Sequence, residues 1–391
     1  MKKKILFVIN SLDLGGAEKS LVSLLNTFDF GKYEVDLLMF QPTGLFLNLL
    51  PDEVNVLPAL DFFVPRESFL SKIKRPKYFS SRLRASLHLR VNRKTKKLHP
   101  AQCYWKYTNK CFNYLEKHYS VAIAWGQGNP THYVAEKVTA DKRIAVINVN
   151  YEGAGHNKKF DLPYYEKYDN ILTVSDSLKQ LTCDVFPTLS NNISTLYDIS
   201  NADVIQRMAK ENNPFANEGN SLIIVTVGRL VPQKGYDLAV DAAKVLKDYH
   251  IDFKWYFVGD GSARADLECE IQVHKLTANV VLTGAENNPY QYISHADIYV
   301  QTSRFEGYCL TLCEARILNK PIVSTNFDVV NNQITNEVNG LIVEMDGKAI
   351  AEAIIRLKND SELTNSFIDI LKKEKKGNPE EILNLYRIIE E

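Results

Sequence analysis

The sequence predicts an α/β protein with two doubly wound, Rossmann-like domains. Short apolar segments alternate with helix-like segments in both halves of the chain, which is typical of parallel, doubly wound sheets. A polar segment without strand character, residues 200–220, divides this alternation into two parts. The length of 391 residues also suits two domains of ordinary size.

The first half begins with a predicted strand at 5–9, a turn at 11–16 (SLDLGG) and a helix at 17–27. The helix places Leu21, Leu24 and Leu25 on one face. Further strands are expected at 33–40, 54–57, 121–124, 143–147 and 171–174. We therefore assign residues 1–199 to an N-terminal domain and residues 200–220 to a linker.

The second half repeats the pattern over residues 221–378, the predicted C-terminal domain. Strands are expected at 222–227, 253–258, 280–282, 298–300, 322–324 and 340–343, with helices at 237–249, 263–275 and 348–358. The tail, 379–391, is predicted to form a last helix, with packing on the N-terminal domain as one option. Two such domains would face each other across a cleft at the carboxyl ends of their strands, where ligands bind in this fold class.

Composition and charge narrow the function classes. Lys+Arg and Asp+Glu both number 47, which argues against a general nucleic-acid binder. The six cysteines form no C-x-x-C pair, and we interpret Cys309 and Cys313, one helical turn apart, as packing thiols in a reduced, cytosolic setting. The apolar run near the N-terminus ends at Ile9, too short for a signal peptide, and no run is long enough to span a membrane.

The segment 66–97 interrupts the alternation. It contains twelve basic residues and one acid, Glu67, with apolar and aromatic residues interleaved. Such a segment can lie on an anionic membrane surface, at roughly 1 kcal/mol per basic residue near the lipid. It can also bind an acidic acceptor, or nucleic acid as the last option, and a solvated basic excursion between two strands is the plain alternative.

Two carboxylates dominate the stretch SRFEGYCLTLCEARILNKP, residues 303–321. Glu306 and Glu314 lie eight residues apart. If a helix begins near Tyr308, Glu306 lies in the preceding loop, Gly307 allows a ligand near the backbone, and Glu314 lies about two turns inside. The free amides at the helix start can bind an anion. A phosphorylated polyhydroxy ligand fits this arrangement, and an amphipathic helix with a buried glutamate is the alternative.

Basic residues and glycine turns follow three other predicted strands. Arg229 and Lys234 share a short loop after 222–227, between Gly228 and Gly235, and two cations at that spacing suit a diphosphate. Two solvent-facing basic residues would be the simpler interpretation. The turn with Gly261 lacks the third glycine of a dinucleotide fingerprint but allows a nucleotide near the backbone.

Gly15 and Gly16 form the corresponding turn after the first strand, which can face a phosphate or a sugar or be a plain βα turn. The chain contains no D-x-D pair. A diphosphate would therefore be held by cations and helix amides rather than through a divalent metal, so no metal or other cofactor is expected. The motifs of α/β-hydrolases, zinc proteases and P-loop proteins are also missing from the sequence.

Taken in order, four segments resemble the family 4 retaining glycosyltransferases of the GT-B type. They are GGAEKS, VGRLVPQKGYDLAVDA, WYFVGDGSARADLE and FEGYCLTLCEARILNKPIVST, and the resemblance is strongest over about residues 221–345. The pair E-x7-E together with R-x4-K makes it specific.

The resemblance implies roles for individual residues. Arg229 and Lys234 would bind the donor diphosphate and stabilise the leaving nucleotide. Glu306 would hold sugar hydroxyls and Glu314 the ribose. The donor site would also include the glycines of the turns and the amides at the helix start, namely Gly15, Gly16, Gly228, Gly261, Gly307, Tyr308, Cys309 and Leu310.

The first half departs from the family where relatives carry a histidine after a strand. Here the segment reads KRIAVINVNYEG, with Asn148 and Asn150 in place of that histidine. His132, in GNPTHYV, is another acceptor-side candidate, and a structural histidine at a helix start is the alternative.

The function implied is a retaining, metal-independent hexosyltransferase that uses a nucleotide sugar, with UDP favoured and GDP second. Its acceptor would be a lipid-linked or surface glycan of a polysaccharide pathway, handled in the cytoplasm at the inner face of the cell membrane with residues 66–97 on the lipid. A non-catalytic binding subunit would bind nucleotide without turnover. A sugar-nucleotide epimerase would isomerise the donor without an acceptor.

Overall fold

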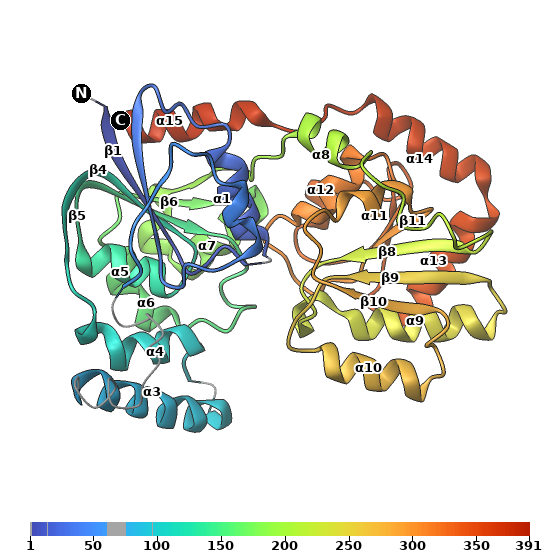
Figure 1. Ribbon diagram of the computed structural model, residues 1–391, viewed down its shortest axis with the longest axis horizontal. Helices are drawn as coiled ribbons and strands as arrows, with labels where there is room; N and C mark the ends of the chain where they lie inside the picture. Colours follow the sequence, from blue (N-terminus) through green and yellow to red (C-terminus); the bar gives the residue numbers. More distant parts are fainter. Residues whose placement is uncertain (1, 14, 61–75, 96) are drawn as a thin grey trace. The chain divides into compact units, whose positions relative to one another are not determined.

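The computed structural model describes residues 2–13, 15–60, 76–95 and 97–391 (Figure 1). Residues 66–75 and 96 of the predicted basic segment therefore lie outside the described residues. The chain divides into two compact units. Unit 1 comprises the residues up to Asp13, Ala17–Asp198 and Glu380–Glu391, and unit 2 comprises Ile199–Pro379 with the short turn at Gly15 and Gly16.

Unit 1 is built on a seven-stranded parallel sheet in the order β3-β2-β1-β4-β5-β6-β7. The strands are β1 (Lys3–Ile9), β2 (Tyr33–Met39), β3 (Asn55–Val56), β4 (Leu115–Trp125), β5 (Val138–Ile147), β6 (Asn170–Thr173) and β7 (Ile193–Thr195). The last five residues of β1 are all buried, because a central parallel strand is covered by helices on both faces. The order reverses between β1 and β4, as a doubly wound sheet requires.

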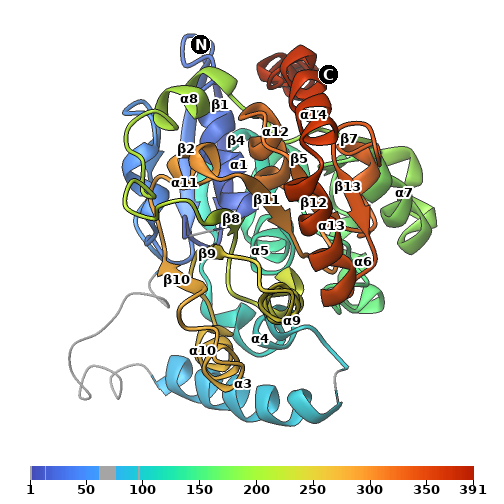
Figure 2. The same cartoon turned by 90° about the vertical axis from the view of Figure 1, so that its right-hand side faces the viewer.

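The helices of unit 1 are α1 (Gly16–Leu25), α3 (Pro76–Thr95), α4 (Pro100–Thr108), α5 (Asn129–Lys137), α6 (Lys158–Tyr165), α7 (Asp176–Val185) and α15 (Ile382–Glu390). Helix α3 runs beside α4 in both ribbon views (Figures 1 and 2). The sequence pattern indicated a basic segment here but did not predict a helix, since α3 buries little of its surface. No described helix is long and apolar enough to cross a membrane.

Unit 2 has a six-stranded parallel sheet in the order β10-β9-β8-β11-β12-β13. The strands are β8 (Leu222–Val227), β9 (Phe253–Val258), β10 (Val280–Gly284), β11 (Ile298–Gln301), β12 (Ile322–Thr325) and β13 (Leu341–Val343). The helices are α8 (Ala202–Met208), α9 (Tyr236–Asp248), α10 (Arg264–Val273), α11 (Tyr290–His295), α12 (Leu310–Ile317), α13 (Gly347–Asn359) and α14 (Ser361–Lys373).

Side chains on alternate positions of β8 enter two different cores. Ile224 belongs to the apolar cluster with helices α9 and α13, and Val225 belongs to the cluster on the opposite face with α12. Successive strand residues point to opposite faces, so one strand contributes to both cores. The two doubly wound sheets confirm the predicted fold class.

The segments that join the units carry more structure than their composition indicates. Residues 200–220, predicted as a linker, include α8, which the side chain of Asn201 caps at the amide of Val204. Ile205 of α8 packs in an apolar cluster with Ile317, so this segment is part of unit 2. A seven-residue helix with one buried side chain leaves little periodicity for a sequence pattern to show.

The C-terminal helix α15 packs on unit 1. Leu385 is fully buried, and the hydroxyl of Tyr386 accepts a hydrogen bond from the amide of Asp29 at 2.6 Å. The ring of Tyr386 stacks on Tyr33 with centroids 5.2 Å apart, and the hydroxyl of Tyr33 donates to Glu390. The end of the chain therefore contributes to the core of the unit that contains its beginning.

Candidate active site

Glu306 and Lys234 form a buried ion pair in unit 2. Oε1 of Glu306 accepts hydrogen bonds from Nζ of Lys234 at 2.6 Å and from the hydroxyl of Ser303 at 2.5 Å. Only 6% of the surface of Glu306 is exposed. Burial alone would lower the pKa of Lys234, but the charge of Glu306 outweighs it and the pKa is raised above its usual value. Lys234 is therefore charged in the folded protein at neutral pH.

The pair forms because the loops after β8 and β11 meet. The two strands are neighbours in the sheet, with Ile298 paired to Ile224. Parallel neighbouring strands end at the same edge, which brings together loops that are 72 residues apart in the sequence. This juxtaposition joins two motifs that the sequence could only identify separately.

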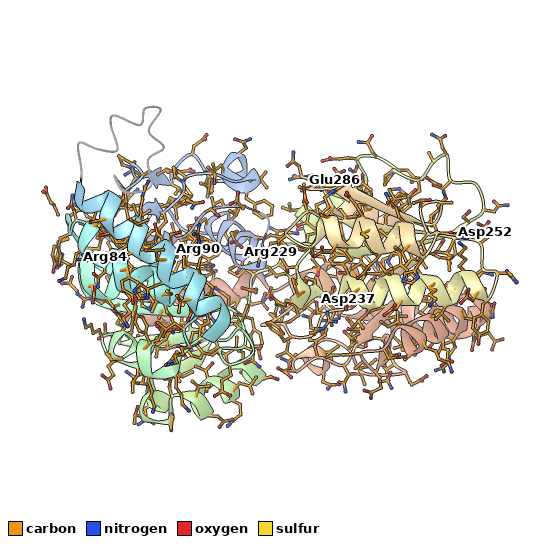
Figure 3. All side chains as sticks on the ribbon, turned by 90° about the horizontal axis from the view of Figure 1, so that it is seen from below. Arg84, Arg90, Arg229, Asp237, Asp252 and Glu286 are labelled. Atoms are coloured by element: carbon orange, nitrogen blue, oxygen red, sulfur yellow. The ribbon has the colours of Figure 1, made fainter. Side chains whose placement is uncertain are left out.

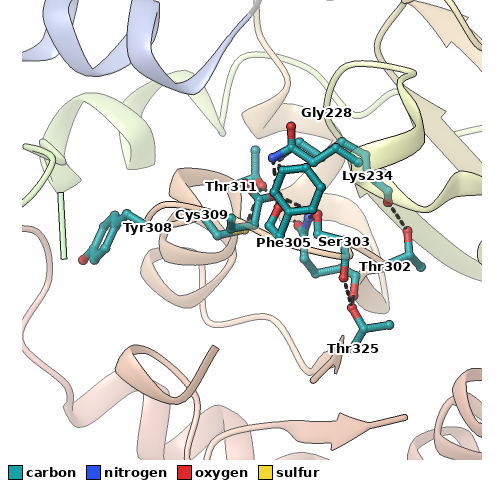
Figure 4. Close-up of polar contacts among 12 residues, drawn as sticks. Gly228, Lys234, Thr302, Ser303, Phe305, Tyr308, Cys309, Thr311 and Thr325 are labelled. Carbon is teal, nitrogen blue, oxygen red and sulfur yellow. Dashed lines mark hydrogen bonds and ion pairs between the residues drawn. The ribbon is translucent and has the colours of Figure 1, made fainter. Parts of the chain in front are cut away.

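Further contacts bind these two loops to each other. Arg304 donates two hydrogen bonds to the carboxylate of Asp237, at 2.8 and 2.5 Å. The hydroxyl of Thr302 donates to the carbonyl of Lys234 at 2.8 Å (Figure 4). Gly235 has a φ of +63°, and a Cβ there would lie 2.1 Å from the carbonyl oxygen of Thr302. Glycine is thus required where the loop turns toward the ion pair.

Arg229 lies in the same loop as Lys234 but, unlike Lys234, it is not buried in an ion pair. Its side chain is exposed, and it makes no hydrogen bond or ion pair with any residue that the structure describes (Figure 3). Its charge acts on Lys234, whose pKa it would lower. A guanidinium without a carboxylate partner, close to an already neutralised ion pair, is available to an anion.

The glycine turn after β9 packs against the loop of Arg229. A Cβ at Gly261 would lie 2.4 Å from the carbonyl oxygen of Leu230, and the amide of Leu230 donates to the carbonyl of Asp260 at 3.0 Å. Gly261 therefore permits close contact between two loops. Its predicted contact with a nucleotide remains a prediction.

Helix α12 begins at Leu310, two residues later than the sequence predicted. Cys309 has a left-handed backbone, with φ of +68°, which an α-helix cannot include. Glu314 consequently lies about one turn inside the helix, and it is buried. Tyr308, Cys309 and Leu310 form the helix start, and the amide of Gln333 donates to the carbonyls of the first two. The first amides of α12 have no partner within the helix.

Both cysteines of this helix are buried. Burial raises the pKa of the Cys309 thiol and that of the Cys313 thiol. Neither thiol is therefore activated as a nucleophile, and their burial fits the interpretation of packing groups. A left-handed non-glycine residue costs of order 1–2 kcal/mol, so the strain at Cys309 must be offset by the packing around it.

The acceptor-side candidates of unit 1 fall into two groups. His132 is fully buried, and its Nε2 lies 2.7 Å from the carboxylate of Asp161, so it fits the structural alternative. Asn150 accepts a bond from the amide of Gly153 at 2.9 Å within its own turn. Asn148 follows β5, and its side-chain oxygen and nitrogen are buried without a hydrogen-bond partner among the described residues.

Gly16 opens α1, and no atom lies within 4 Å of the position that its Cβ would occupy. Nothing steric in the structure therefore requires a glycine there. A ligand contact and a plain βα turn both remain compatible with the Gly15–Gly16 turn.

Gln301 and Ser303, which the motifs did not single out, connect to Glu306 from the end of β11. A signal was present: the apolar strand ends in the polar run Gln301-Thr302-Ser303, and all three residues are buried. Polar side chains at the carboxyl end of a central parallel strand are typical of ligand sites. Among the described residues, no group of three or more His, Cys, Asp or Glu could hold a metal ion.

Residues 208–374 match the family model "Glycosyl transferases group 1". Poly(ribitol-phosphate) alpha-N-acetylglucosaminyltransferase of Staphylococcus aureus is 26% identical, over 66% of this chain and 53% of its own length. UDP-Gal:alpha-D-GlcNAc-diphosphoundecaprenol alpha-1,3-galactosyltransferase of Escherichia coli is 30% identical, over 37% of this chain and 38% of its own. The chain spans about half the length of the first curated relatives it matches.

A solved structure resembles the whole chain. Anabaena Alr3699/HepE in complex with UDP and glucose superposes with a TM-score of 0.72 at 15% identity, covering 99% of both chains. At this identity the similarity concerns the fold, and it confirms the predicted GT-B architecture. Residues 208–374 are thus similar to the group 1 glycosyltransferases, and the chain has a GT-B fold.

Proposed function

We propose that this GT-B chain is a glycosyltransferase that moves a sugar from a nucleoside diphosphate to a glycan acceptor. The observation that carries the proposal is the buried pair of Glu306 and Lys234 beside the unpaired Arg229. The pair is neutral overall, so Arg229 leaves the site with a net positive charge. An anionic ligand that also offers hydroxyl groups would match it, and a sugar diphosphate has both features.

The donor would be held without a metal ion. The amino group of Lys234 has three N–H donors, one of which is directed to Glu306. The others and the guanidinium of Arg229 would bind the diphosphate, with the amides at the start of α12 as a third source of positive potential. Glu306 would bind sugar hydroxyls and Glu314 the ribose. UDP is the favoured nucleotide, because the relative from Escherichia coli is named for UDP-Gal.

The transfer would retain the anomeric configuration, as in the family 4 enzymes that the sequence resembles. A double displacement needs a free carboxylate as nucleophile. The carboxylate of Glu306 is ion-paired with Lys234 and accepts a second hydrogen bond from Ser303, and both contacts lower its nucleophilicity. Front-side attack, with the leaving phosphate accepting the proton of the acceptor hydroxyl, would need no such group.

The acceptor would be a lipid-linked or surface glycan. By their names, one relative acts on a diphosphoundecaprenol-linked sugar and another on poly(ribitol-phosphate). A lipid-linked acceptor requires access to a membrane, which we place at the cytoplasmic face. Asn148 would provide an acceptor-side contact in unit 1, since its side chain has hydrogen-bonding capacity that the described residues do not use.

Helix α3 is the element that would lie on the membrane. Leu83, Leu87 and Val91 are spaced along one face at i, i+4 and i+8, and each is more than half exposed. Arg84 and Arg90 are exposed beside them, and α3 contains no acidic residue (Figure 3). An apolar stripe flanked by arginines is typical of a helix that lies in the interface of an anionic bilayer.

The donor site is tested by titration calorimetry with UDP, GDP and ADP, with and without EDTA. We expect one nucleotide to bind, no effect of EDTA, and at least about tenfold weaker binding in Arg229→Ala, or about 1.4 kcal/mol. Arg207→Ala is the matched control, because Arg207 is an exposed arginine of the same unit on α8. If no nucleotide binds, the enzyme proposal fails; binding without turnover would favour a binding subunit, and donor isomerisation without acceptor an epimerase.

The membrane surface is tested by vesicle sedimentation. Wild-type protein should bind vesicles with phosphatidylglycerol more tightly than neutral ones, and less tightly at high salt. The triple variant Leu83→Ser/Leu87→Ser/Val91→Ser should lose most of this binding, whereas Val273→Ser, at an exposed apolar position on α10, should retain it. Equal binding of the triple variant would remove α3 from the proposal.

A further inference from the structure

A directed chain of hydrogen bonds reaches Glu306 from the interior of unit 2. The hydroxyls of Tyr299 and Thr311 donate to Oε1 of Gln301, at 2.6 and 3.1 Å. Nε2 of Gln301 donates to the hydroxyl of Ser303 at 2.7 Å, and that hydroxyl donates to Oε1 of Glu306 at 2.5 Å. Every donor in the chain points toward the carboxylate.

The geometry of β11 creates this chain. Tyr299, Gln301 and Ser303 are two residues apart, so an extended backbone places them on the same face. At most 1% of the surface of each is exposed. The backbone is also fixed, since the hydroxyl of Thr325 on the neighbouring strand donates to the carbonyls of Gln301 and Ser303, at 3.3 and 2.6 Å.

The direction of the chain follows from the amide of Gln301. Its oxygen faces two hydroxyls and its NH₂ group faces the oxygen of Ser303. Because Ser303 receives a hydrogen bond from Gln301, its own proton is free to go to Glu306. A buried polar chain whose members are all satisfied rigidifies the group at its end.

The two carboxylate oxygens of Glu306 differ in their hydrogen bonding. Oε1 is held from two sides, by Ser303 and by Lys234. Oε2 has no hydrogen bond to any residue in the described part of the chain, and the side chain of Glu306 is only 8% exposed. Oε1 is therefore hydrogen-bonded within the protein, and Oε2 can accept a hydrogen bond from a ligand at a fixed position.

We propose that Ser303, Gln301 and Tyr299 are positioning residues that hold Oε1 of Glu306 so that Oε2 receives a hydroxyl of the donor sugar. The role in sugar binding rests on the function proposed above; the role in orienting Glu306 does not. The chain ends at the carboxylate and makes no contact with Arg229, so we expect it to act on the sugar more than on the diphosphate, which it reaches only through the pair of Glu306 and Lys234.

Three variants separate this role from a structural one. Ser303→Ala removes the direct donor to Glu306, and Tyr299→Phe removes only the hydroxyl at the far end of the chain. Ser324→Ala is the matched control, because Ser324 is equally buried, lies on β12 and donates only to the carbonyl of Thr325. All three delete one buried hydroxyl.

The first readout is the ligand-free protein labelled with ¹³C at glutamate carboxyls. The resonance of Glu306 is identified by its loss in Glu306→Gln. We expect Ser303→Ala to move it clearly, Tyr299→Phe to move it less, and Ser324→Ala to leave it unchanged. An unmoved resonance in both Ser303→Ala and Tyr299→Phe would overturn the positioning role whatever the protein catalyses.

The second readout compares UDP with UDP-glucose and UDP-N-acetylglucosamine as probes. We expect Ser303→Ala to bind UDP within about twofold of wild type and to lower kcat for hydrolysis or transfer of the sugar about tenfold or more, with a smaller loss in Tyr299→Phe. Equal losses for UDP and for the sugar nucleotides would overturn the sugar-specific role. If wild type binds none of the probes, the proposed function fails, and the resonance of Glu306 still decides whether the chain orients it.

Discussion

Asp198 should make the stability of unit 1 depend on pH in an unusual direction. Its carboxylate is buried and accepts a hydrogen bond from the hydroxyl of Ser20 on α1. Burial raises the pKa of Asp198 to about 7, although the bond from Ser20 opposes the shift. The ordinary value in an unfolded chain is about 3.9.

The sign follows from comparing the two states. Below about pH 4 the carboxyl is protonated in both, and it adds no pH dependence. Between about pH 4 and 7 the unfolded chain releases the proton while the folded protein retains it, so stability falls as pH rises. Above the folded pKa the loss of stability is complete. The difference of about 3 units between the folded and the unfolded pKa of Asp198 corresponds to at most roughly 4 kcal/mol.

The substitution Asp198→Asn should remove this loss. The amide has the same shape, carries no charge, and its oxygen can still accept the bond from Ser20. The variant should match the wild type near pH 4 and exceed it by up to about 4 kcal/mol at pH 8. Urea unfolding followed by tryptophan fluorescence measures this, since Trp105 and Trp125 are both buried in unit 1. Asp184→Asn, at an exposed position on α7, controls for the lost charge. Parallel pH profiles for Asp198→Asn and wild type would refute the reasoning.

Two further predictions concern packing. Leu385→Ala should destabilise unit 1 by about 2–5 kcal/mol in urea unfolding, because it empties a buried position of α15. Leu383→Ala should have little effect, because Leu383 is 61% exposed on the same helix. Equal effects of the two substitutions would mean that α15 does not pack on unit 1. Gly219 and Gly235 have nearly the same φ, +64° and +63°, but only a Cβ at Gly235 would clash, with the carbonyl of Thr302. Gly219→Ala should therefore cost about 1 kcal/mol and Gly235→Ala clearly more in thermal unfolding, and the same loss in both would contradict the clash.

Two helices that the sequence pattern did not predict share one physical feature. The basic segment and the linker looked irregular, yet 76–95 is a helix and 202–208 is another. Neither helix has a wide buried apolar face: the apolar side chains Leu83, Leu87 and Val91 of α3 are exposed, and α8 buries a single residue, Ile205. The periodic spacing of apolar residues arises because one face of a helix is buried. Helices that bury little apolar surface are therefore poorly predicted from sequence. For His132 the sequence left a site role and a structural role open, and the structure places this residue fully buried beside Asp161.

The local part of the fold was readable from the sequence alone. Alternating apolar runs predicted the parallel sheets, because strand period is a property of neighbouring residues. The two motifs with Arg229, Lys234, Glu306 and Glu314 indicated candidate residues for a donor site, and their roles stay a prediction. Which strand lies beside which was decided only by tertiary structure. The pairing of β8 with β11 brought Lys234 to Glu306 across 72 residues and aligned Gln301 and Ser303 behind the carboxylate. Such contacts depend on sheet order, which residue patterns along the chain do not encode.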